Sequence, residues 1–123
     1  MAHQSRIGAL CIDCKTEDLS EATTFWAEAL RTTGEVDADG KYAKIGGYAG
    51  YPKVLLQAVD HDPRIHLDIE TDDKEAEVAR MTAIGAVEVA RIKGWIVMEA
   101  PTGHRFCIVD PQGNDWPDNK GEG

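Results

Sequence analysis

The seven residues from Arg64 to Glu70 constrain the fold of this chain more than any other segment. Apolar and ionisable side chains alternate strictly along them. The apolar positions are Ile65, Leu67 and Ile69, and the ionisable ones are Arg64, His66, Asp68 and Glu70. Successive side chains of a β-strand point to opposite sides of a sheet, so the pattern predicts a strand with one apolar and one polar face. A solvated surface would explain the polar face, but two other predicted strands repeat it, which favours a functional surface.

A first helix is predicted after the strand at residues 7–14. Asp18 is expected to cap it, with Glu21 three residues later as in a capping box. Apolar residues spaced by three and four form a single stripe, as expected when one face of a helix is buried. The stripe consists of Leu19, Ala22, Phe25, Trp26, Ala29 and Leu30.

A second helix follows the strand at residues 64–70. Asp72 or Asp73 is expected to cap it and Gly85 to close it. Its apolar side is expected to consist of Ala76 or Ala79, Val78, Met81 and Ile84. Further strands are predicted at residues 41–45, 54–59, 87–92, 95–99 and 104–109. The order of strand, helix and strands therefore occurs twice, in about residues 6–60 and 62–110, and a loose tail follows at 111–123.

The two faces of each strand can be assigned because the helices must cover the apolar one, at about 25 cal/mol per Å² buried. The residues expected beneath the helices are Leu10, Ile12, Ile65, Leu67, Ile69, Phe106 and Ile108. Those expected on the opposite face are Cys11, Asp13, Leu55, Gln57, Arg64, His66, Asp68, Arg105, Cys107 and Val109. Trp95 fits either the core or the polar face. The two arginines could pair with Asp13 and Asp68 or hold an anionic substrate.

The charge balance and the cysteines restrict the partners and the compartment. The formal net charge is −9, which disfavours nucleic acids and anionic membranes because both require clustered lysines and arginines. No apolar run approaches the ~20 residues of a membrane span, and no signal-peptide pattern opens the chain. Three cysteines do not fit a disulfide framework, so a reducing cytoplasm is expected.

Several motifs in this order resemble the vicinal oxygen chelate superfamily, which includes glyoxalase I, extradiol dioxygenases and bleomycin-resistance proteins. The local match is closest to bacterial glyoxalase-like domain proteins. The motifs are Asp13-Cys14, Phe25-Trp26, Ala29-Leu30, His66-Leu67-Asp68-Ile69, Arg80 to Ala86, Gly94-Trp95 and Ala100 to Ile108. The resemblance implies an α+β fold of one domain over residues 1–123. Two βαβββ modules would form a curved, half-open mixed sheet around a central trough, with the helices outside.

The resemblance also implies where a metal would bind. Carried over by position, the ligand places are Cys11, Gln57, His66 and Cys107. Only His66 is a common ligand in the metal-using members, and their glutamates are replaced by Gln57 and Cys107. Thiolates, an imidazole and an amide oxygen suit Zn²⁺ better than Mg²⁺ or Mn²⁺. The expectation is no cofactor, with zinc or another divalent metal as the alternative.

Three functions are compatible with these residues. The first is a glyoxalase- or bleomycin-resistance-like protein that binds a small molecule in the trough. Its predicted ligand contacts are Asp13, Leu55, Arg64, Asp68, Trp95 and Arg105. The second is a zinc-dependent lyase or isomerase of the glyoxalase type, with His66 and Cys107 as catalytic residues. The third is a non-catalytic domain that dimerises, and a homodimer is expected in any of the three.

Overall fold

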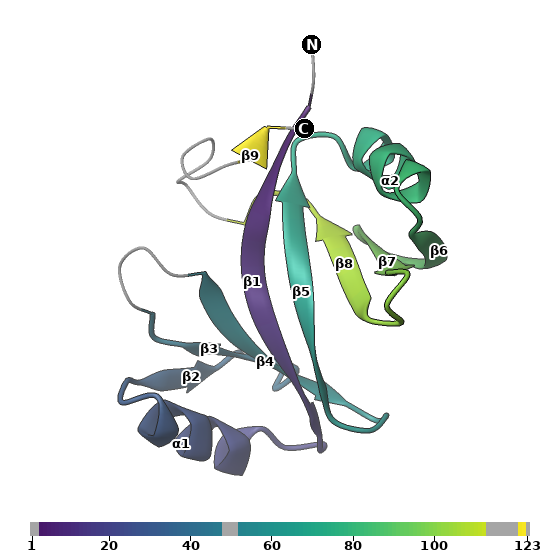
Figure 1. The fold of residues 1–123 in the computed structure, drawn as a ribbon. Helices are drawn as coiled ribbons and strands as arrows, with labels where there is room; N and C mark the ends of the chain where they lie inside the picture. The colour runs from purple at the N-terminus through teal and green to yellow at the C-terminus, as the bar shows by residue number, and fades with distance from the viewer. Residues whose placement is uncertain (1–2, 48–51, 113–120, 123) are drawn as a thin grey trace. The chain divides into compact units, whose positions relative to one another are not determined.

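The computed structural model describes residues 3–47, 52–112 and 121–122, which form two helices and nine strands (Figure 1). The first βαβββ series is β1 (Gln4–Lys15), α1 (Ser20–Ala29), β2 (Gly34–Val36), β3 (Tyr42–Ile45) and β4 (Lys53–Val59). The second is β5 (Arg64–Thr71), α2 (Lys74–Ala83), β6 (Val87–Ile92), β7 (Trp95–Glu99) and β8 (Arg105–Val109). A short β9 (Gly121–Glu122) follows. The predicted α+β class and the two modules are thus confirmed, whereas the trough stays a prediction.

The chain divides into two compact units, of which the first is Ala9–His66. Here β1 and β4 are parallel, and β3 pairs antiparallel with both β4 and β2. Helix α1 packs against β2 and β3 (Figure 1). The core between helix and strands contains Leu19, Ala43, Ile45 and Leu56, with Ile12, Cys14 and Trp26 packed against it. One face of β1 is therefore apolar and covered, as the alternation predicted.

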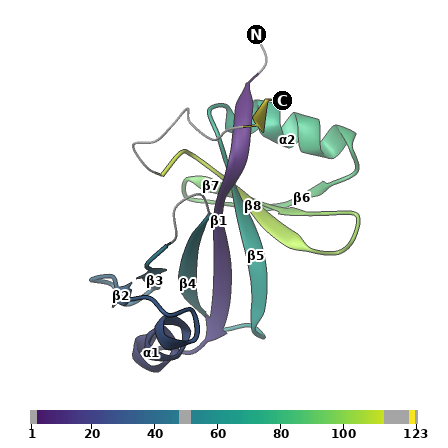
Figure 2. The same cartoon turned by 60° about the vertical axis from the view of Figure 1, so that its left-hand side comes forward.

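The second unit comprises residues 1–8 and 67–123. Its strand order is β5-β8-β7-β6, in which β5 and β8 are parallel and the other pairs are antiparallel. Helix α2 packs against β6 and β8 (Figure 2). The core contains Ala86, Ile96, Met98 and Ile108, with Val78, Met81 and Phe106 packed against it. Neither helix of the described chain has the length and apolar character needed to cross a membrane.

The two helices begin differently. Asp73 caps α2, because its carboxylate accepts a hydrogen bond of 3.0 Å from the backbone N–H of Ala76. The prediction that Asp18 caps α1 is wrong, since the helix begins at Ser20 and the capping position is Leu19. Asp18 instead accepts from the Ser20 N–H at 2.9 Å, which lowers the pKa of its carboxyl.

Five residues predicted to be buried beneath the helices are exposed, and these predictions are wrong. They are Phe25, Ala29, Ile65, Leu67 and Ile84. For Leu67 the reason is the position of α2, which packs against β6 and β8. Strand alternation separates two faces correctly, but it does not say which strands a helix reaches.

Buried carboxylates hold the start of β1 to β5 and α2 in the second unit. Arg6 Nε donates to Glu70 Oε1 at 2.8 Å, and His3 Nε2 lies 2.6 Å from Glu77 Oε1. Glu77 also accepts two hydrogen bonds from Arg80, at 2.9 and 2.8 Å. Burial acts to raise the pKa of the Glu77 carboxyl, but the bonds from Arg80 and His3 outweigh it and the pKa is lowered. The apolar stripe predicted for the second helix did not indicate that Glu77 would be buried on α2.

Candidate functional site

The face of β1 that points away from the helix core carries two buried functional side chains, Cys11 and Asp13. Their neighbours Ile12 and Cys14 pack against the core on the other side. Cys11 and Cys14 therefore lie on opposite faces, as a spacing of three residues along a strand requires. In parallel register, Leu55 pairs with Cys11 and Gln57 pairs with Asp13, so the same polar face continues onto β4.

Asp13 is the centre of a charged group within this unit. Its side chain is only 3% exposed, and His66 Nδ1 lies 3.0 Å away and hydrogen-bonds to Oδ2. Arg64 Nε lies 3.6 Å and His61 Nε2 3.7 Å from the same oxygen. The other oxygen, Oδ1, is buried and has no hydrogen-bond partner within the described part of the chain, although it also lies 3.0 Å from His66 Nδ1. A buried carboxylate is stable only when cations and donors surround it, which is the arrangement here.

The bond to Asp13 determines how His66 can act. The imidazole side chain is 10% exposed, and a carboxylate acceptor at Nδ1 favours the tautomer that carries its proton there. Nε2 is then the nitrogen suited to bind a metal or to exchange a proton with a ligand. Asp13 therefore orients His66, whereas the sequence had predicted it as a ligand contact or as the partner of an arginine.

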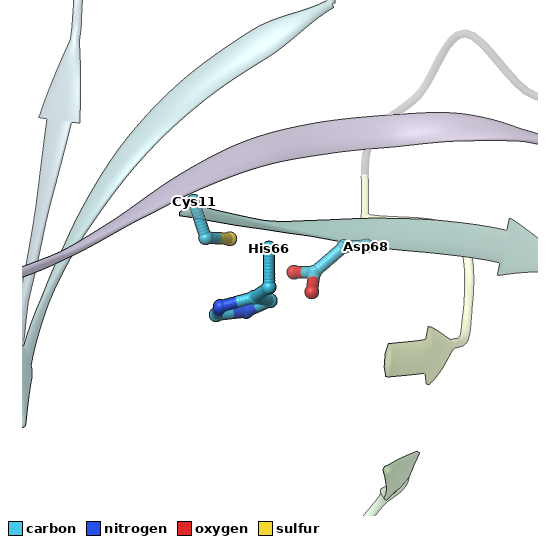
Figure 3. A group of neighbouring side chains, drawn as sticks. All are labelled: Cys11, His66 and Asp68. Atoms are coloured by element: carbon cyan, nitrogen blue, oxygen red, sulfur yellow. The ribbon is translucent and has the colours of Figure 1, made fainter. Parts of the chain in front are cut away.

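Cys11, His66 and Asp68 form a possible metal-ligand group (Figure 3). The ligand atoms of Cys11 and His66 lie within 4.8 Å of each other, as do those of His66 and Asp68. His66 and Asp68 are two residues apart on β5, so strand geometry places both on one face. Cys11 comes from β1, and Figure 3 shows its sulfur directed to the same side of the ribbon as the imidazole.

The donor set of this group fits zinc. A thiolate, an imidazole and a carboxylate are all zinc ligands, and three protein ligands with one open position are typical of catalytic sites. Mg²⁺ and Ca²⁺ prefer oxygen ligands, and Asp68 is the one residue of this group that offers oxygen atoms. Cys11 and His66 belong to the predicted metal set. Asp68 was predicted as a ligand contact and not as a metal ligand, and it supplies the carboxylate that Gln57 and Cys107 lack. Cys107 is not in the group, although it is the register partner of Asp68 on β8.

The other predicted contacts lie on the face of the second unit opposite its core. Trp95 alternates with the buried Ile96, and its half-buried side chain lies on this face together with Glu99. Arg105 Nε donates to Glu99 Oε1 at 2.9 Å. That acceptor was not among the partners predicted for the arginine. Trp95 is thus assigned to the polar face, a position that the sequence left open.

Cys14 is a poor candidate for thiol chemistry. Burial, and secondarily the neighbouring charge of Asp13, raise the pKa of its thiol. Its Sγ donates to the Ile12 carbonyl at 3.5 Å. The thiol is therefore protonated at neutral pH, and thiolates are the reactive and metal-binding form of cysteine.

Sequence reasoning missed His61. This residue lies in the turn between β4 and β5, where no periodic pattern assigns a face. Arg64 Nη2 lies 3.3 Å from His61 Nε2, and both side chains reach toward Asp13. Only the fold of the turn brings His61 to the carboxylate.

Comparisons with known proteins agree with this fold. A family model described as a glyoxalase-like domain matches residues 9–109. A structure described as NAD-dependent benzaldehyde dehydrogenase from Legionella pneumophila is similar with a TM-score of 0.60 and 14% identity, covering 84% of this chain and 99% of that one. A hypothetical protein from Bacillus halodurans C-125 is similar with a TM-score of 0.62 and 10% identity, covering 89% and 96%. At these identities the structures show a shared fold alone. No curated protein matches the sequence.

Proposed function

Because the chain belongs to the glyoxalase-like domain family, we propose that it binds a small molecule at the polar face around His66. The observation that carries the proposal is the hydrogen bond between His66 Nδ1 and the buried carboxylate of Asp13. An ordinary solvated strand face would leave both groups in water. Here an oriented imidazole stands beside a thiol and a second carboxylate, and small-molecule sites use few, well-placed polar groups of this kind.

The Oδ1 atom of Asp13, which accepts no hydrogen bond from the described residues, indicates the chemistry of the ligand. A buried acceptor without a hydrogen bond costs about 1–3 kcal/mol, and a ligand that donates to it would remove that cost. The net charge of −9 attracts cations over the whole surface as well. A cationic or hydrogen-bond-donating molecule is the class supported best.

A thermal-shift screen with cationic aromatic compounds, followed by calorimetry, tests this proposal. In Asp13→Asn, binding of a stabilising compound should weaken about tenfold, the equivalent of one lost charged hydrogen bond. Asp62→Asn is the matched control, because it removes the same charge from a side chain that is 95% exposed. Equal weakening in both variants would show that only net charge matters, and the proposed site would be wrong.

A second candidate function, metal-dependent chemistry of the glyoxalase type, is favoured by the group of Cys11, His66 and Asp68. These three side chains would hold a zinc ion, which when bound supplies a Lewis acid that polarises a substrate oxygen. Asp13 would keep the proton on Nδ1 of His66 and so direct Nε2 toward the ion. The reaction class would be a lyase or isomerase step.

Zinc titration distinguishes the two candidates without any activity assay. The metal-dependent candidate predicts one equivalent of zinc bound by the wild type and loss of this binding in His66→Ala and Asp68→Asn. His104→Ala is the matched control, since His104 is exposed and bonded to Thr102. If zinc binds the wild type and His66→Ala equally, the metal-dependent candidate is eliminated.

A further inference from the structure

Strand β6 carries an unusual concentration of exposed apolar side chains. It is an edge strand, with β7 as its neighbour in the strand order of the described residues. Val87 is 62% exposed, and Val89 and Ile92 are each 42% exposed. Ile84, exposed at the end of α2, lies just before it in the chain. An edge strand presents unpaired backbone N–H and C=O groups, so β6 offers both hydrogen bonds and apolar surface to a partner.

The sequence of β6 is complementary to itself when two copies run antiparallel. When the two-fold axis passes between Val89 and Ala90, Val89 of one copy lies opposite Ala90 of the other. Glu88 then lies opposite Arg91, and Val87 opposite Ile92. Opposite charges and apolar residues directly across an antiparallel pair are favourable, whereas like charges are unfavourable. Every position of the strand meets a compatible residue in this register.

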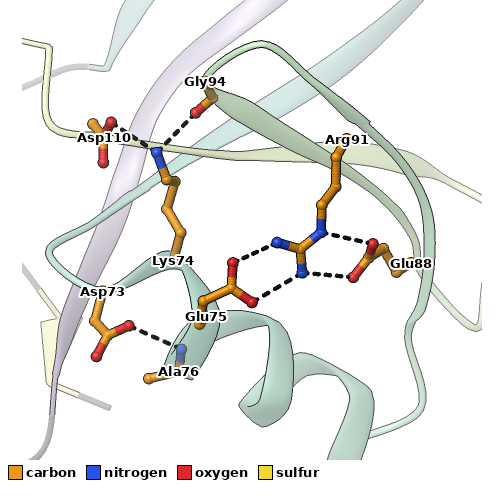
Figure 4. A network of polar contacts seen from close by, with 8 residues as sticks. All are labelled: Asp73, Lys74, Glu75, Ala76, Glu88, Arg91, Gly94 and Asp110. Carbon is orange, nitrogen blue, oxygen red and sulfur yellow. Dashed lines mark hydrogen bonds and ion pairs between the residues drawn. The ribbon is translucent and has the colours of Figure 1, made fainter.

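A β-bulge in β6 brings its two charged residues to one face. The register with β7 shifts between Glu88 and Ala90, so the residue between them has no partner on β7. As a result Glu88 and Arg91, three residues apart, lie on the same face and form two hydrogen bonds at 2.9 and 3.0 Å (Figure 4). Arg91 also binds Glu75 on α2, which fixes the guanidinium beside the strand (Figure 4).

We propose that β6 pairs antiparallel with β6 of a second copy of this chain, about an axis between Val89 and Ala90. Bulges often protect edge strands from pairing because they twist the edge, and charges of one sign do so because a second strand would meet like charges. Here the charges are of both signs and symmetrically placed, so a second copy meets an opposite charge at each position. The Glu88–Arg91 pairs of the two chains form one row of four charges that alternate in sign. Val87 of each chain packs against Ile92 of the other. This arrangement would produce a two-fold symmetric dimer.

Light scattering during size-exclusion chromatography tests the pairing. At roughly 100 μM the wild type should elute with the mass of two chains, and Val89→Lys with the mass of one. Phe25→Lys is the matched control, because it introduces the same charge at an exposed apolar residue of α1 and should remain a dimer. Circular dichroism checks that each variant is folded. A monomeric wild type, or a dimer that persists in a folded Val89→Lys variant, overturns the proposal that β6 pairs with β6 of a second copy.

Charge reversal tests the register. Glu88→Arg places two arginines opposite each other in a homodimer, and Arg91→Glu places two glutamates opposite each other, so each variant alone should be monomeric. A mixture of the two should form a heterodimer, because arginine and glutamate then face each other at both positions. Native mass spectrometry measures the three species. If the mixture yields no more dimer than the separate variants do, the proposed register is wrong.

Discussion

His66 and Asp13 are 53 residues apart in the sequence and are joined by a hydrogen bond of 3.0 Å between Nδ1 and Oδ2. The carboxylate is buried, and Arg64 and His61 lie within 3.7 Å of it. This hydrogen bond distinguishes the polar face from an ordinary solvated one, because it fixes the tautomer and the orientation of the imidazole. Cys11 and Asp68 then complete a set of groups that can bind a ligand or a metal ion.

The first prediction concerns the tautomer of His66. In the wild type, long-range ¹H–¹⁵N spectra of the imidazole should show the proton on Nδ1, since Asp13 accepts from it. Asp13→Ala should shift the population toward the Nε2–H tautomer, which is the usual form of a free neutral histidine side chain. His104 lies outside this site and should keep its spectrum. An unchanged His66 spectrum in Asp13→Ala would show that the carboxylate does not orient the ring.

The second prediction concerns the close approach of β1 to β5. A Cβ at Gly8 would overlap Glu70 Cγ, and Glu70 is fixed by Arg6 and by the Gln112 backbone N–H. Gly8→Ala should therefore lower the free energy of unfolding by about 1–3 kcal/mol, as overpacking does. Gly94→Ala is the control, because a Cβ at that glycine would meet no other atom within 4 Å. Urea unfolding measures both, and equal stability of the two variants would contradict the close approach.

The third prediction is a pH dependence of stability that arises from Glu77. Its pKa in the folded state is lowered from the ordinary value of 4.5, so ionised Glu77 stabilises the fold above about pH 4.5, and this contribution is lost as the pH falls through the lowered pKa. At pH 7, Glu77→Gln should cost about 1–3 kcal/mol because it removes the charged partner of Arg80 and His3. The difference from the wild type should shrink below pH 4.

The control for this third prediction is Glu21→Gln, which removes an exposed glutamate from the first turn of α1. Its effect on the free energy of unfolding should be small at every pH. Urea unfolding between pH 3 and pH 8 gives both curves. A cost for Glu77→Gln that stays constant over this range would contradict the role of the ionised carboxylate.

The fourth prediction concerns the reactivity of the cysteines. Because burial and Asp13 raise the pKa of Cys14, its alkylation by iodoacetamide at pH 8 should be slower than that of a free cysteine peptide. Peptide mass spectrometry after timed quenching measures the rate. Asp13→Asn removes the electrostatic contribution and should accelerate the reaction modestly. Alkylation of Cys14 in the wild type as fast as that of the peptide would contradict its raised pKa.

Local patterns predicted most of the secondary structure. Strict alternation located β5, and the segments 87–92 and 95–99 agree with β6 and β7 to the residue, because the Lys93-Gly94 turn separates them. The three-residue β2 was missed, since a strand this short shows no alternation. The first helix cap was placed one residue too early because an aspartate near a helix start can bond to the backbone without being the cap.

The site was predicted less completely than the fold. Alternation correctly assigned Cys11, Asp13 and Leu55 to the polar face. The pairing of Asp13 with His66 depends on contacts between strands far apart in the sequence, and no local pattern encodes those. The contribution of His61 depends on the path of a turn, and the periodicity of the sequence does not predict that path.

Chemical-shift mapping by ¹H–¹⁵N NMR tests the central claim most directly. Each compound that raises the melting temperature in the screen is titrated into the labelled wild type and into His66→Ala. We expect the wild-type amide signals of Cys11, Asp13 and His66 to shift in proportion to occupancy, and the His66→Ala spectrum to respond weakly or not at all. Shifts confined to other parts of the chain, and unchanged in His66→Ala, would contradict this claim.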